Sequence, residues 1–446
     1  MKIHFIAIGG SIMHALAINL KSQGHEISGS DDAIYDPART NLKNAGILPN
    51  KEGWFLENIN EDLDFIILGM HAKIDNPELE VAKRKKIRIY SFPEFIAKNS
   101  KDKFKVVITG SHGKTSITSM IMYALKKNNI LFDYLVGAKI KGFDNMVSLS
   151  DNKIIIIEGD EYFSSKLDMT PKFMYYEPNI LVVSGISWDH INVYPTFSSY
   201  CNVFKNLIKN TPKKSSIFYY NNDSILKNII DENSLDAQAY SLPSYKVCKG
   251  KFIIVHENIE FPLKIFGKHN LCNLQVASLV CDKLGLKKNL FFKSIVSFEG
   301  AAKRLTFLGN ITETNNVYLD FAHSPSKVLA TTQAVKELFP NRVLVSCLEL
   351  HSFSSLNFDF ISEYSNSFIY SDVVYIYFSS KELKRKNLDL FKTSDVLNKI
   401  NHNNVIVFDN SYDLFNALSN SNWENSNLLL MSSGNFGGLN LDNLFQ

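Results

Sequence analysis

The sequence predicts an α/β protein of three domains, each built on a mostly parallel sheet with helices on its faces. Apolar stretches of strand length alternate with helical patterns along most of the chain, as in parallel sheets joined by crossover helices. The 446 residues are enough for roughly two to four domains of ordinary size. Because 45% of the residues are hydrophobic, each domain can bury a core of its own.

The first domain, expected over residues 1–100, opens with a strand at 3–8 that enters a tight glycine turn and then a helix through Leu20. The turn resembles a dinucleotide-binding fingerprint, but Ala7 and Ile12 stand where its first and third glycines would be, which weakens an NAD interpretation. The turn residues can still present N–H groups to a diphosphate at the start of the helix: Gly9, Gly10 and Ser11. A second strand ends at Ser30-Asp31, and a third, at 63–68, is followed by His71.

The second domain is expected over residues 101–299 and the third over 300–446, with a polar linker at 98–103. Strands of the second domain are predicted at 105–109, 153–157 and 180–183, before a less regular stretch at 211–265. The third domain has strand-like runs at 317–320, 343–348, 373–377 and 428–431, with a helical pattern at 325–338. The repeated strand–helix order predicts a parallel sheet in each of them.

Composition excludes several classes of protein. The net charge of +3 argues against a nucleic-acid-binding protein, which needs a concentrated basic face. The longest apolar runs have strand length and cannot span a membrane, and the N-terminus lacks the long apolar segment of a signal peptide. The five cysteines show no paired short spacing, which predicts reduced thiols in a cytoplasmic protein.

The clearest chemical motif follows the strand at 105–109, and a helical pattern comes directly after it: Gly110, Ser111, His112, Gly113, Lys114, Thr115 and Ser116. Glycines let backbone N–H groups point into one concavity, and the helix adds its positive N-terminal end. Lys114 can neutralise the β- and γ-phosphates of ATP, and the hydroxyl of Thr115 or Ser116 can bind Mg²⁺. The general phosphate-loop pattern is incomplete, since its first glycine would fall at Ile108.

Candidate metal ligands follow the next two strands. The strand at 154–157 ends in Glu158, and a carboxylate at the end of a buried strand beside a phosphate loop is well placed for Mg²⁺. The strand at 180–183 is followed by Asp189-His190. The alternative is structural, because acids commonly end strands and a single histidine is more often structural than functional.

The loop Thr109–Ser116 resembles the phosphate loop of the Mur ligases and the folylpolyglutamate synthases, and further motifs follow in the order of that family. Gly267-Lys268-His269-Asn270-Leu271-Cys272-Asn273 resembles its adenosine motif. The segment 298–304 resembles its domain junction, and 320–325 its C-terminal signature. The resemblance covers essentially the whole chain and implies the three-domain Mur ligase architecture, with Rossmann-like first and last domains around a central ATPase domain.

The resemblance implies a role for each motif. Glu158 and His190 would bind Mg²⁺, with Asp189 orienting His190, and Lys205 stands where some members carry a carbamoylated lysine. Asn270 and Asn273 would hold the nucleotide, Arg304 would reach the ATP phosphates, and Asp320 would bind ribose with His323 beside it. In the first domain, the turn at 9–11 would hold a UDP diphosphate. Ser30-Asp31 would approach the uridine. His71 and Asn76-Pro77-Glu78-Leu79 resemble a further segment of the family near the sugar.

The activity that the resemblance implies is ATP-dependent amide formation on the lactyl carboxylate of UDP-N-acetylmuramate through an acyl phosphate. Two branches of the family share this layout. One adds L-alanine, and the other, the murein peptide ligases, adds L-alanyl-γ-D-glutamyl-meso-diaminopimelate. The chain looks more similar to the second in four segments: 158–162, Lys172-Phe173, 320–325 and 431–438. One segment departs from it, because 348–355 lacks the usual arginine, which leaves His351, Ser354 and Ser355 as candidate acceptor contacts.

Three alternatives stay open from the residues. A dehydrogenase would need the intact glycine fingerprint and would leave Lys114 without a task. A nucleotide-binding protein without turnover would hold ATP but release no phosphate. A folylpolyglutamate synthase would share the ATP core, but that family begins close to its phosphate loop, whereas here a whole predicted domain precedes it.

Overall fold

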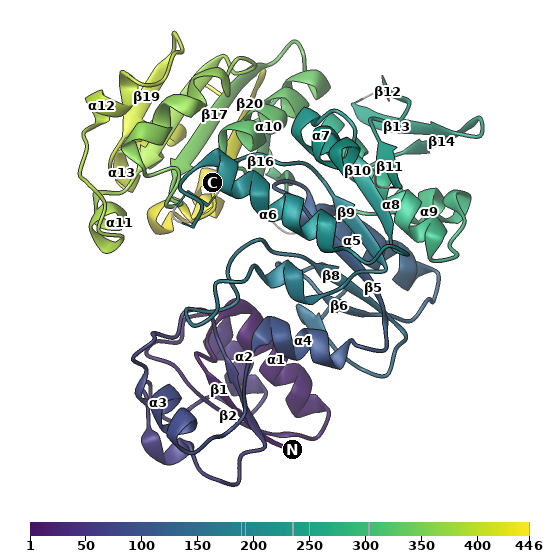
Figure 1. The fold of residues 1–446 in the computed structure, drawn as a ribbon. Helices are drawn as coiled ribbons and strands as arrows, with labels where there is room; N and C mark the ends of the chain where they lie inside the picture. Colours follow the sequence, from purple (N-terminus) through teal and green to yellow (C-terminus); the bar gives the residue numbers. More distant parts are fainter. Residues whose placement is uncertain (189, 192, 234–235, 249, 302–303, 446) are drawn as a thin grey trace. The chain divides into compact units, whose positions relative to one another are not determined.

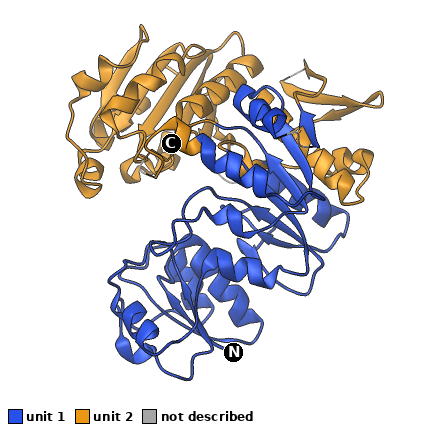
Figure 2. Cartoon of the chain, in the orientation of Figure 1, with its two compact units in different colours: residues 1–110, 117–186, 201–240 blue, residues 111–116, 187–200, 241–446 orange. Residues whose placement is uncertain are grey.

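The computed structural model describes residues 1–188, 190–191, 193–233, 236–248, 250–301 and 304–445, and these form two compact units (Figure 2). Unit 1 comprises residues 1–110, 117–186 and 201–240. Unit 2 comprises residues 111–116, 187–200 and 241–446. The phosphate-loop motif therefore divides, with Gly110 in unit 1 and the next six residues in unit 2. The expected domain boundaries at 100 and 299 remain a prediction.

Unit 1 begins with a four-stranded parallel sheet in the order β2-β1-β3-β4 (Figure 1). Its strands are β1 (Lys2–Ile6), β2 (Glu26–Ser30), β3 (Phe65–Leu68) and β4 (Ile89–Ser91). Its helices are α1 (Ser11–Ser22), α2 (Ala38–Asn44), α3 (Pro77–Arg84) and α4 (Phe92–Asn99). β3 and the last four residues of β1 are buried throughout, as expected when both faces of a parallel sheet are covered.

A second sheet of unit 1 has seven strands in the order β11-β10-β9-β5-β8-β6-β7, and only β7 is antiparallel to its neighbour. Its strands are β5 (Phe104–Thr109), β6 (Asp133–Leu135), β7 (Val147–Ser148), β8 (Ile154–Glu158), β9 (Ile180–Val183), β10 (Ser216–Tyr220) and β11 (Ala237–Tyr240). Its helices are α5 (Lys114–Lys127), α6 (Phe197–Asn210) and α7 (Ser224–Glu232). β5 lies between β8 and β9, so the loops after these three strands share one edge of the sheet.

Unit 2 contains a three-stranded antiparallel sheet that the sequence did not predict: β12 (Tyr245–Cys248), β13 (Lys251–His256) and β14 (Ile259–Pro262). It lies in the stretch described above as less regular, which also contains β10, α7 and β11. Two helices follow it, α8 (Lys268–Lys283) and α9 (Lys288–Ile295).

The remaining sheet of unit 2 has six strands in the order β15-β16-β20-β17-β18-β19, with only β15 antiparallel. Its strands are β15 (Thr306–Gly309), β16 (Asn316–Asp320), β17 (Val343–Leu350), β18 (Val373–Phe378), β19 (Val405–Phe408) and β20 (Ser426–Met431). Its helices are α10 (Pro325–Leu338), α11 (Ser380–Arg385), α12 (Thr393–Leu397) and α13 (Ser411–Ser419). The chain inserts β20 between β16 and β17, and ligands bind at such switch points in open parallel sheets.

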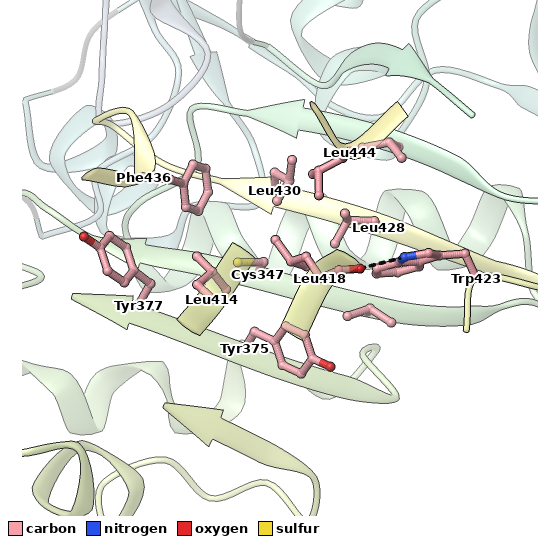
Figure 3. Packing of buried hydrophobic residues seen from close by; sticks show 12 residues of the cluster. Cys347, Tyr375, Tyr377, Leu414, Leu418, Trp423, Leu428, Leu430, Phe436 and Leu444 are labelled. Carbon is pink, nitrogen blue, oxygen red and sulfur yellow. Dashed lines mark hydrogen bonds between the residues drawn. The ribbon is translucent and has the colours of Figure 1, made fainter. Parts of the chain in front are cut away.

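A core on one face of this sheet anchors the loop after β20 (Figure 3). Leu428 and Leu430 pack there with Leu414 of α13, and Trp423 Nε1 donates a hydrogen bond to a carbonyl of α13 at 2.9 Å. Phe436, which follows β20, is 1% exposed in the same core. Fully burying such a side chain stabilises the fold by roughly 1.5–3 kcal/mol, so the loop 432–438 is held in place by its own phenylalanine.

Short 3₁₀ helices complete the chain: η1 (Leu56–Asn58), η2 (Lys172–Tyr175), η3 (Phe358–Asn366), η4 (Phe436–Gly438) and η5 (Leu441–Phe445). Within the parts of the chain that the structure describes, no helix is long and apolar enough to cross a membrane. The predicted helix at 325–338 and strand at 180–183 are confirmed to the residue. Most other predicted strands differ from the observed ones by one or two residues at their ends.

Candidate active site

The predicted phosphate loop leads from β5 into α5, and its two glycines stand where no side chain fits. Gly110 has a φ of +121°, and a Cβ atom there would lie 2.5 Å from Ser184 Oγ. Gly113 has a φ of +75°, and its Cβ would lie 2.3 Å from Asn273 Oδ1. Both positions therefore require glycine for conformation and for space. Lys114 is the first residue of α5, at the helix end that attracts anions.

Side chains within unit 2 hold the tip of this loop. Ser111 Oγ accepts a hydrogen bond from the Ser187 N–H at 2.8 Å and lies 2.8 Å from the hydroxyl of Tyr200. His112 Nε2 lies 2.8 Å from Ser326 Oγ in the first turn of α10. These contacts fix the course of the loop before any ligand is considered. The glycine-lined loop, its lysine and the following helix together fit a nucleotide phosphate.

Glu158 ends β8 beside the phosphate-loop strand, since it pairs with Ile108 of β5 in the sheet. Its Oε2 accepts a hydrogen bond from the Gly137 N–H at 2.8 Å, and a Cβ at Gly137 would lie 2.9 Å from Oε1. The carboxylate is thus held at the carboxyl edge of the sheet, as predicted. A carboxylate fixed at such a sheet edge can bind Mg²⁺.

His190 lies in a left-handed turn, with a φ of +56°, and its carbonyl accepts the N–H groups of Val193 and Tyr194 at 2.8 Å each. Such a conformation is uncommon for a residue with a side chain and clusters at functional sites. His190 belongs to unit 2 and Glu158 to unit 1, so their joint role as Mg²⁺ ligands stays a prediction. Asp189, predicted to orient His190, lies outside the described residues.

Lys205 lies on α6, where its Nζ pairs with Glu232 Oε2 at 2.7 Å and its side chain is 45% exposed. This is the environment of an ordinary surface ion pair. We therefore leave Lys205 out of the proposed metal site. Among the residues that the structure describes, no three His, Cys, Asp or Glu side chains are grouped as a metal site.

Asn270 and Asn273 are both buried on α8, three residues apart and hence on one helical face. Asn270 Nδ2 donates to the carbonyl of Phe266 at 2.9 Å, which fixes the amide. Asn273 approaches the phosphate loop at Gly113. The predicted adenosine motif and the tip of the predicted phosphate loop are therefore adjacent within unit 2.

Arg304, from the C-terminal part of unit 2, also meets this loop, and Asp320 lies near Arg304. The Arg304 guanidinium stacks on Phe321 at 4.4 Å from the ring centre, and its Nη2 lies 3.4 Å from Thr115 Oγ1. Asp320 ends β16 and accepts the Ala322 N–H at 2.7 Å. Burial raises the pKa of Asp320 to about 6, although the positive charge of Arg304 opposes that shift. The structure thus gathers five predicted residues within unit 2: Gly113, Thr115, Asn273, Arg304 and Asp320.

The glycine turn at 9–11 differs from the phosphate loop at 110–116, because an acidic side chain of the protein lies against it. Ala7 adopts a φ of +68°, the left-handed conformation that the missing first glycine of the fingerprint would take more easily. The Gly9 N–H donates to Asp31 Oδ2 at 2.7 Å. Burial is the largest cause that raises the pKa of Asp31 to about 6. Ser11 begins α1, and His71 follows β3 on the surface.

A buried carboxylate, predicted only as part of a segment near the sugar, holds the neighbouring loop. Glu78 of α3 is fully buried, and its Oε1 accepts hydrogen bonds from Ser30 Oγ at 2.6 Å and from the Phe55 N–H at 2.8 Å. His4 Nε2 lies 3.3 Å from the other oxygen. Ser30, predicted to approach the uridine, is therefore positioned by Glu78. In the sequence, Glu78 is otherwise visible only as an acidic residue in the first turn of a short helix. Such an acid ordinarily interacts only with the helix dipole.

The carboxyl edge of the six-stranded sheet contains another buried carboxylate, which the sequence analysis did not assign. Glu349 of β17 is 2% exposed, and its Oε2 accepts the Phe436 N–H at 2.8 Å and a hydrogen bond from Ser432 Oγ. His351 Nδ1 lies 3.8 Å from Oε1. Ser355 Oγ accepts the His351 N–H at 2.9 Å, so this predicted acceptor contact shapes its own loop instead. Ser354 is buried, whereas His351 is partly exposed.

A basic side chain directly after α11 reaches the same edge. Lys386 Nζ lies 4.6 Å from the ring centre of Phe353, in the loop after β17, and its side chain is only 12% exposed. Arg385 binds Glu382 through Nε at 3.1 Å and Nη2 at 2.8 Å. The segment 380–386 contains four cations and one carboxylate: Lys381, Lys384, Arg385, Lys386 and Glu382. We refer to residues 380–386 as the basic segment.

Comparison with known proteins places these motifs in one family. Residues 2–104 match the Mur ligase family catalytic domain, and residues 108–281 match the Mur ligase middle domain. The UDP-N-acetylmuramate–L-alanine ligase of Caldicellulosiruptor bescii is 32% identical over 399 residues, which cover 84% of this chain and 83% of that protein. This chain belongs to the Mur ligase family. It is an ATP-dependent ligase that forms amide bonds.

Two further matches frame the question of substrate. The UDP-N-acetylmuramate–L-alanyl-γ-D-glutamyl-meso-2,6-diaminoheptandioate ligase of Haemophilus influenzae is 27% identical, over 75% of this chain and 76% of that protein. The crystal structure of a murein peptide ligase from Psychrobacter arcticus superposes with a TM-score of 0.68 at 21% identity, covering 100% of this chain and 99% of the other. At that identity the superposition establishes the three-domain Mur ligase fold. The similar sequences include both an L-alanine ligase and a peptide ligase.

Proposed function

We propose that this Mur ligase joins UDP-N-acetylmuramate to the tripeptide L-alanyl-γ-D-glutamyl-meso-diaminopimelate. The observation that carries the proposal is the basic segment at the carboxyl edge of the six-stranded sheet. The tripeptide carries several free carboxylates, whereas L-alanine carries a single one. Arg385 and Lys386 could pair with the peptide carboxylates and so replace the arginine that is missing from 348–355.

In the proposed first step, the lactyl carboxylate attacks the γ-phosphate of ATP, ADP leaves, and an acyl phosphate forms. Lys114 and Arg304 lie at the phosphate loop, where their charges would stabilise the transferring phosphoryl group. Mg²⁺, when bound by Thr115, Glu158 and His190, would neutralise phosphate charge and align the reacting oxygens. Asn270, Asn273 and Asp320 would hold the nucleoside.

In the proposed second step, the free amine of the acceptor attacks the acyl carbon, the amide forms, and inorganic phosphate leaves. The residues of the site act by positioning, by charge and by exclusion of water, so no protein nucleophile is required. The UDP diphosphate would lie at the turn 9–11 and the N-terminus of α1, while the Gly9 N–H stays hydrogen-bonded to Asp31. The segment Ser30-Asp31, held by Glu78, would lie at the uridine, with His71 near the sugar.

The test compares two acceptors. Purified enzyme is incubated with ATP, Mg²⁺ and UDP-N-acetylmuramate, with either the tripeptide or L-alanine, and products are identified by mass. The proposal predicts at least about tenfold higher kcat/KM for the tripeptide. A preference for L-alanine, which the similarity to L-alanine ligases favours, would assign the chain to that branch and refute the tripeptide.

A further inference from the structure

The helix α10 contacts both predicted nucleotide-binding motifs within unit 2. Its first turn reaches the phosphate loop, where Ser326 Oγ lies 2.8 Å from His112 Nε2. Ser187 Oγ is 3.4 Å from the same hydroxyl. Neither the Walker-type pattern nor the metal ligands account for His112, since its side chain is directed to α10. This histidine therefore connects the phosphate loop to the C-terminal part of the chain.

The last turn of α10 reaches the adenosine motif. Glu337 Oε1 accepts a hydrogen bond from the Tyr245 hydroxyl at 2.6 Å, and Glu337 Oε2 lies 3.8 Å from Nζ of Lys268. Lys268 is the first residue of α8, two positions before Asn270. Burial and the Glu337 carboxylate both raise the pKa of Tyr245, so its hydroxyl stays a donor at neutral pH.

Between the two ends of α10, the helix packs closely against the residue that precedes α8. Gly267, which precedes α8, has a φ of +91°, and a Cβ atom there would lie 2.6 Å from Cβ of Ala334. Ala334 is 1% exposed. The small residues let α10 approach the start of α8 more closely than larger side chains would permit. From Ser326 to Glu337 the helix rises about 17 Å, so one rigid element connects the two motifs.

We infer that Ser326 and Glu337 are positioning residues that clamp α10 across the ATP site, one at the phosphate loop and one at the adenosine motif. The inference rests on the proposed roles of the phosphate loop and of Asn270 and Asn273. The clamp holds the C-terminal part of the ligase over bound nucleotide and keeps water from the acyl phosphate. Without either end, the nucleotide binds less tightly, and water competes with the acceptor amine for the acyl carbon.

Two conservative variants test the two ends separately. Ser326→Ala removes the hydroxyl beside His112. Tyr245→Phe removes the donor to Glu337 and leaves the ring, which stacks on Phe252 at 5.5 Å and 7°. Matched controls in the same unit are Ser362→Ala and Tyr412→Phe, whose side chains lie on the surface. Thermal unfolding serves to check that all four variants fold.

The first readout is the affinity for a non-hydrolysable ATP analogue, which needs no sugar nucleotide or acceptor. We expect each variant to weaken it about three- to tenfold, the usual effect of one lost hydrogen bond, while both controls bind as the wild type does. The second readout is the ratio of phosphate released to amide formed. It should be close to one in the wild type and rise severalfold in each variant.

The two readouts separate failure of the clamp from failure of the proposed function. Wild-type analogue affinity in both variants would overturn the clamp, whatever the ligase makes. If the wild type forms no amide on UDP-N-acetylmuramate, the proposed substrate is wrong, and the analogue affinities still decide whether the clamp exists. A double variant should combine the two losses, because the contacts lie at opposite ends of one helix.

Discussion

Two glycine turns of this ligase each lead from a parallel strand into a helix, and they differ in the charge at the turn. At 9–11, the Gly9 N–H is hydrogen-bonded to a carboxylate of the protein itself, Asp31. At 110–116, a lysine opens the helix and an arginine approaches its first turn. In the proposed mechanism, the turn at 9–11 only has to hold a diphosphate, for which N–H groups suffice, whereas phosphoryl transfer at 110–116 needs cations to stabilise moving charge. The charge at each turn agrees with a proposed binding role for the first and a proposed catalytic role for the second.

The largest effect is expected from Lys114→Ala. Loss of the charge at the γ-phosphate should lower kcat by at least about a thousandfold, in line with the magnitude of other charged groups that stabilise phosphoryl transfer. Lys127→Ala, at the other end of α5, is the matched control and should leave kcat within about twofold. Substantial ATP-dependent ligation by Lys114→Ala would contradict the proposed catalytic role of the loop at 110–116.

The two turns should also differ in their tolerance of a methyl group. At Gly113, alanine meets Asn273 Oδ1 at 2.3 Å in a left-handed conformation, and we expect ligation to fall about a hundredfold or more. Gly9 lies outside the left-handed region, and its nearest atom is Asp31 Oδ2 at 2.9 Å, so alanine there meets less strain. Gly9→Ala should therefore mainly raise the KM for UDP-N-acetylmuramate, by about tenfold. Equal losses of kcat in both variants would show that the turns do not differ in role.

The buried carboxylate of Asp320 should lower the stability of the folded protein at neutral pH while it contributes to ATP binding. Its pKa is raised in the folded state to about 6, so between its ordinary value and pH 6 the folded protein holds a proton that the unfolded chain has lost. Its contribution to stability accordingly falls as pH rises through that window, by up to about 3 kcal/mol. Asp320→Asn should therefore raise the Tm at pH 7.5 more than at pH 4, and weaken ATP binding. A lower Tm at pH 7.5 would show that the ionised carboxylate is stabilising.

The smallest effect concerns acceptor choice, which neither glycine turn determines. Arg385→Gln with Lys386→Gln should raise the KM for the tripeptide about fivefold, because a charged hydrogen bond contributes roughly 1.5–3 kcal/mol and exposure reduces it. The control, Lys399→Gln, lies in the same unit outside the basic segment. Trapping the acyl phosphate with hydroxylamine should give equal rates in all three proteins, since that step precedes the acceptor. An unchanged tripeptide KM would remove the basic segment from the site.

Regions with a strong apolar pattern could be predicted from the sequence, as the continuous apolar run of β9 and the helical pattern of α10 show. The antiparallel sheet β12–β14 could not, because its strands are partly exposed and their apolar pattern is weak. In the candidate site, local motifs such as the phosphate loop were identifiable from contiguous residues. The roles of Glu78 and Glu349 could not be identified in this way, because their hydrogen-bond partners lie far along the chain. Glu78 binds Ser30, and Glu349 binds Phe436. A buried carboxylate depends on tertiary contacts that no local pattern contains.

The most direct test of the account follows an oxygen atom from substrate to product. UDP-N-acetylmuramate labelled with ¹⁸O in its lactyl carboxylate is converted with ATP, Mg²⁺ and the tripeptide, and the released phosphate is analysed by mass spectrometry. We predict one labelled oxygen in each phosphate, because the carboxylate oxygen bridges to phosphorus in the acyl phosphate and leaves with it. Amide formation with unlabelled phosphate would contradict the acyl-phosphate mechanism proposed for the loop at 110–116.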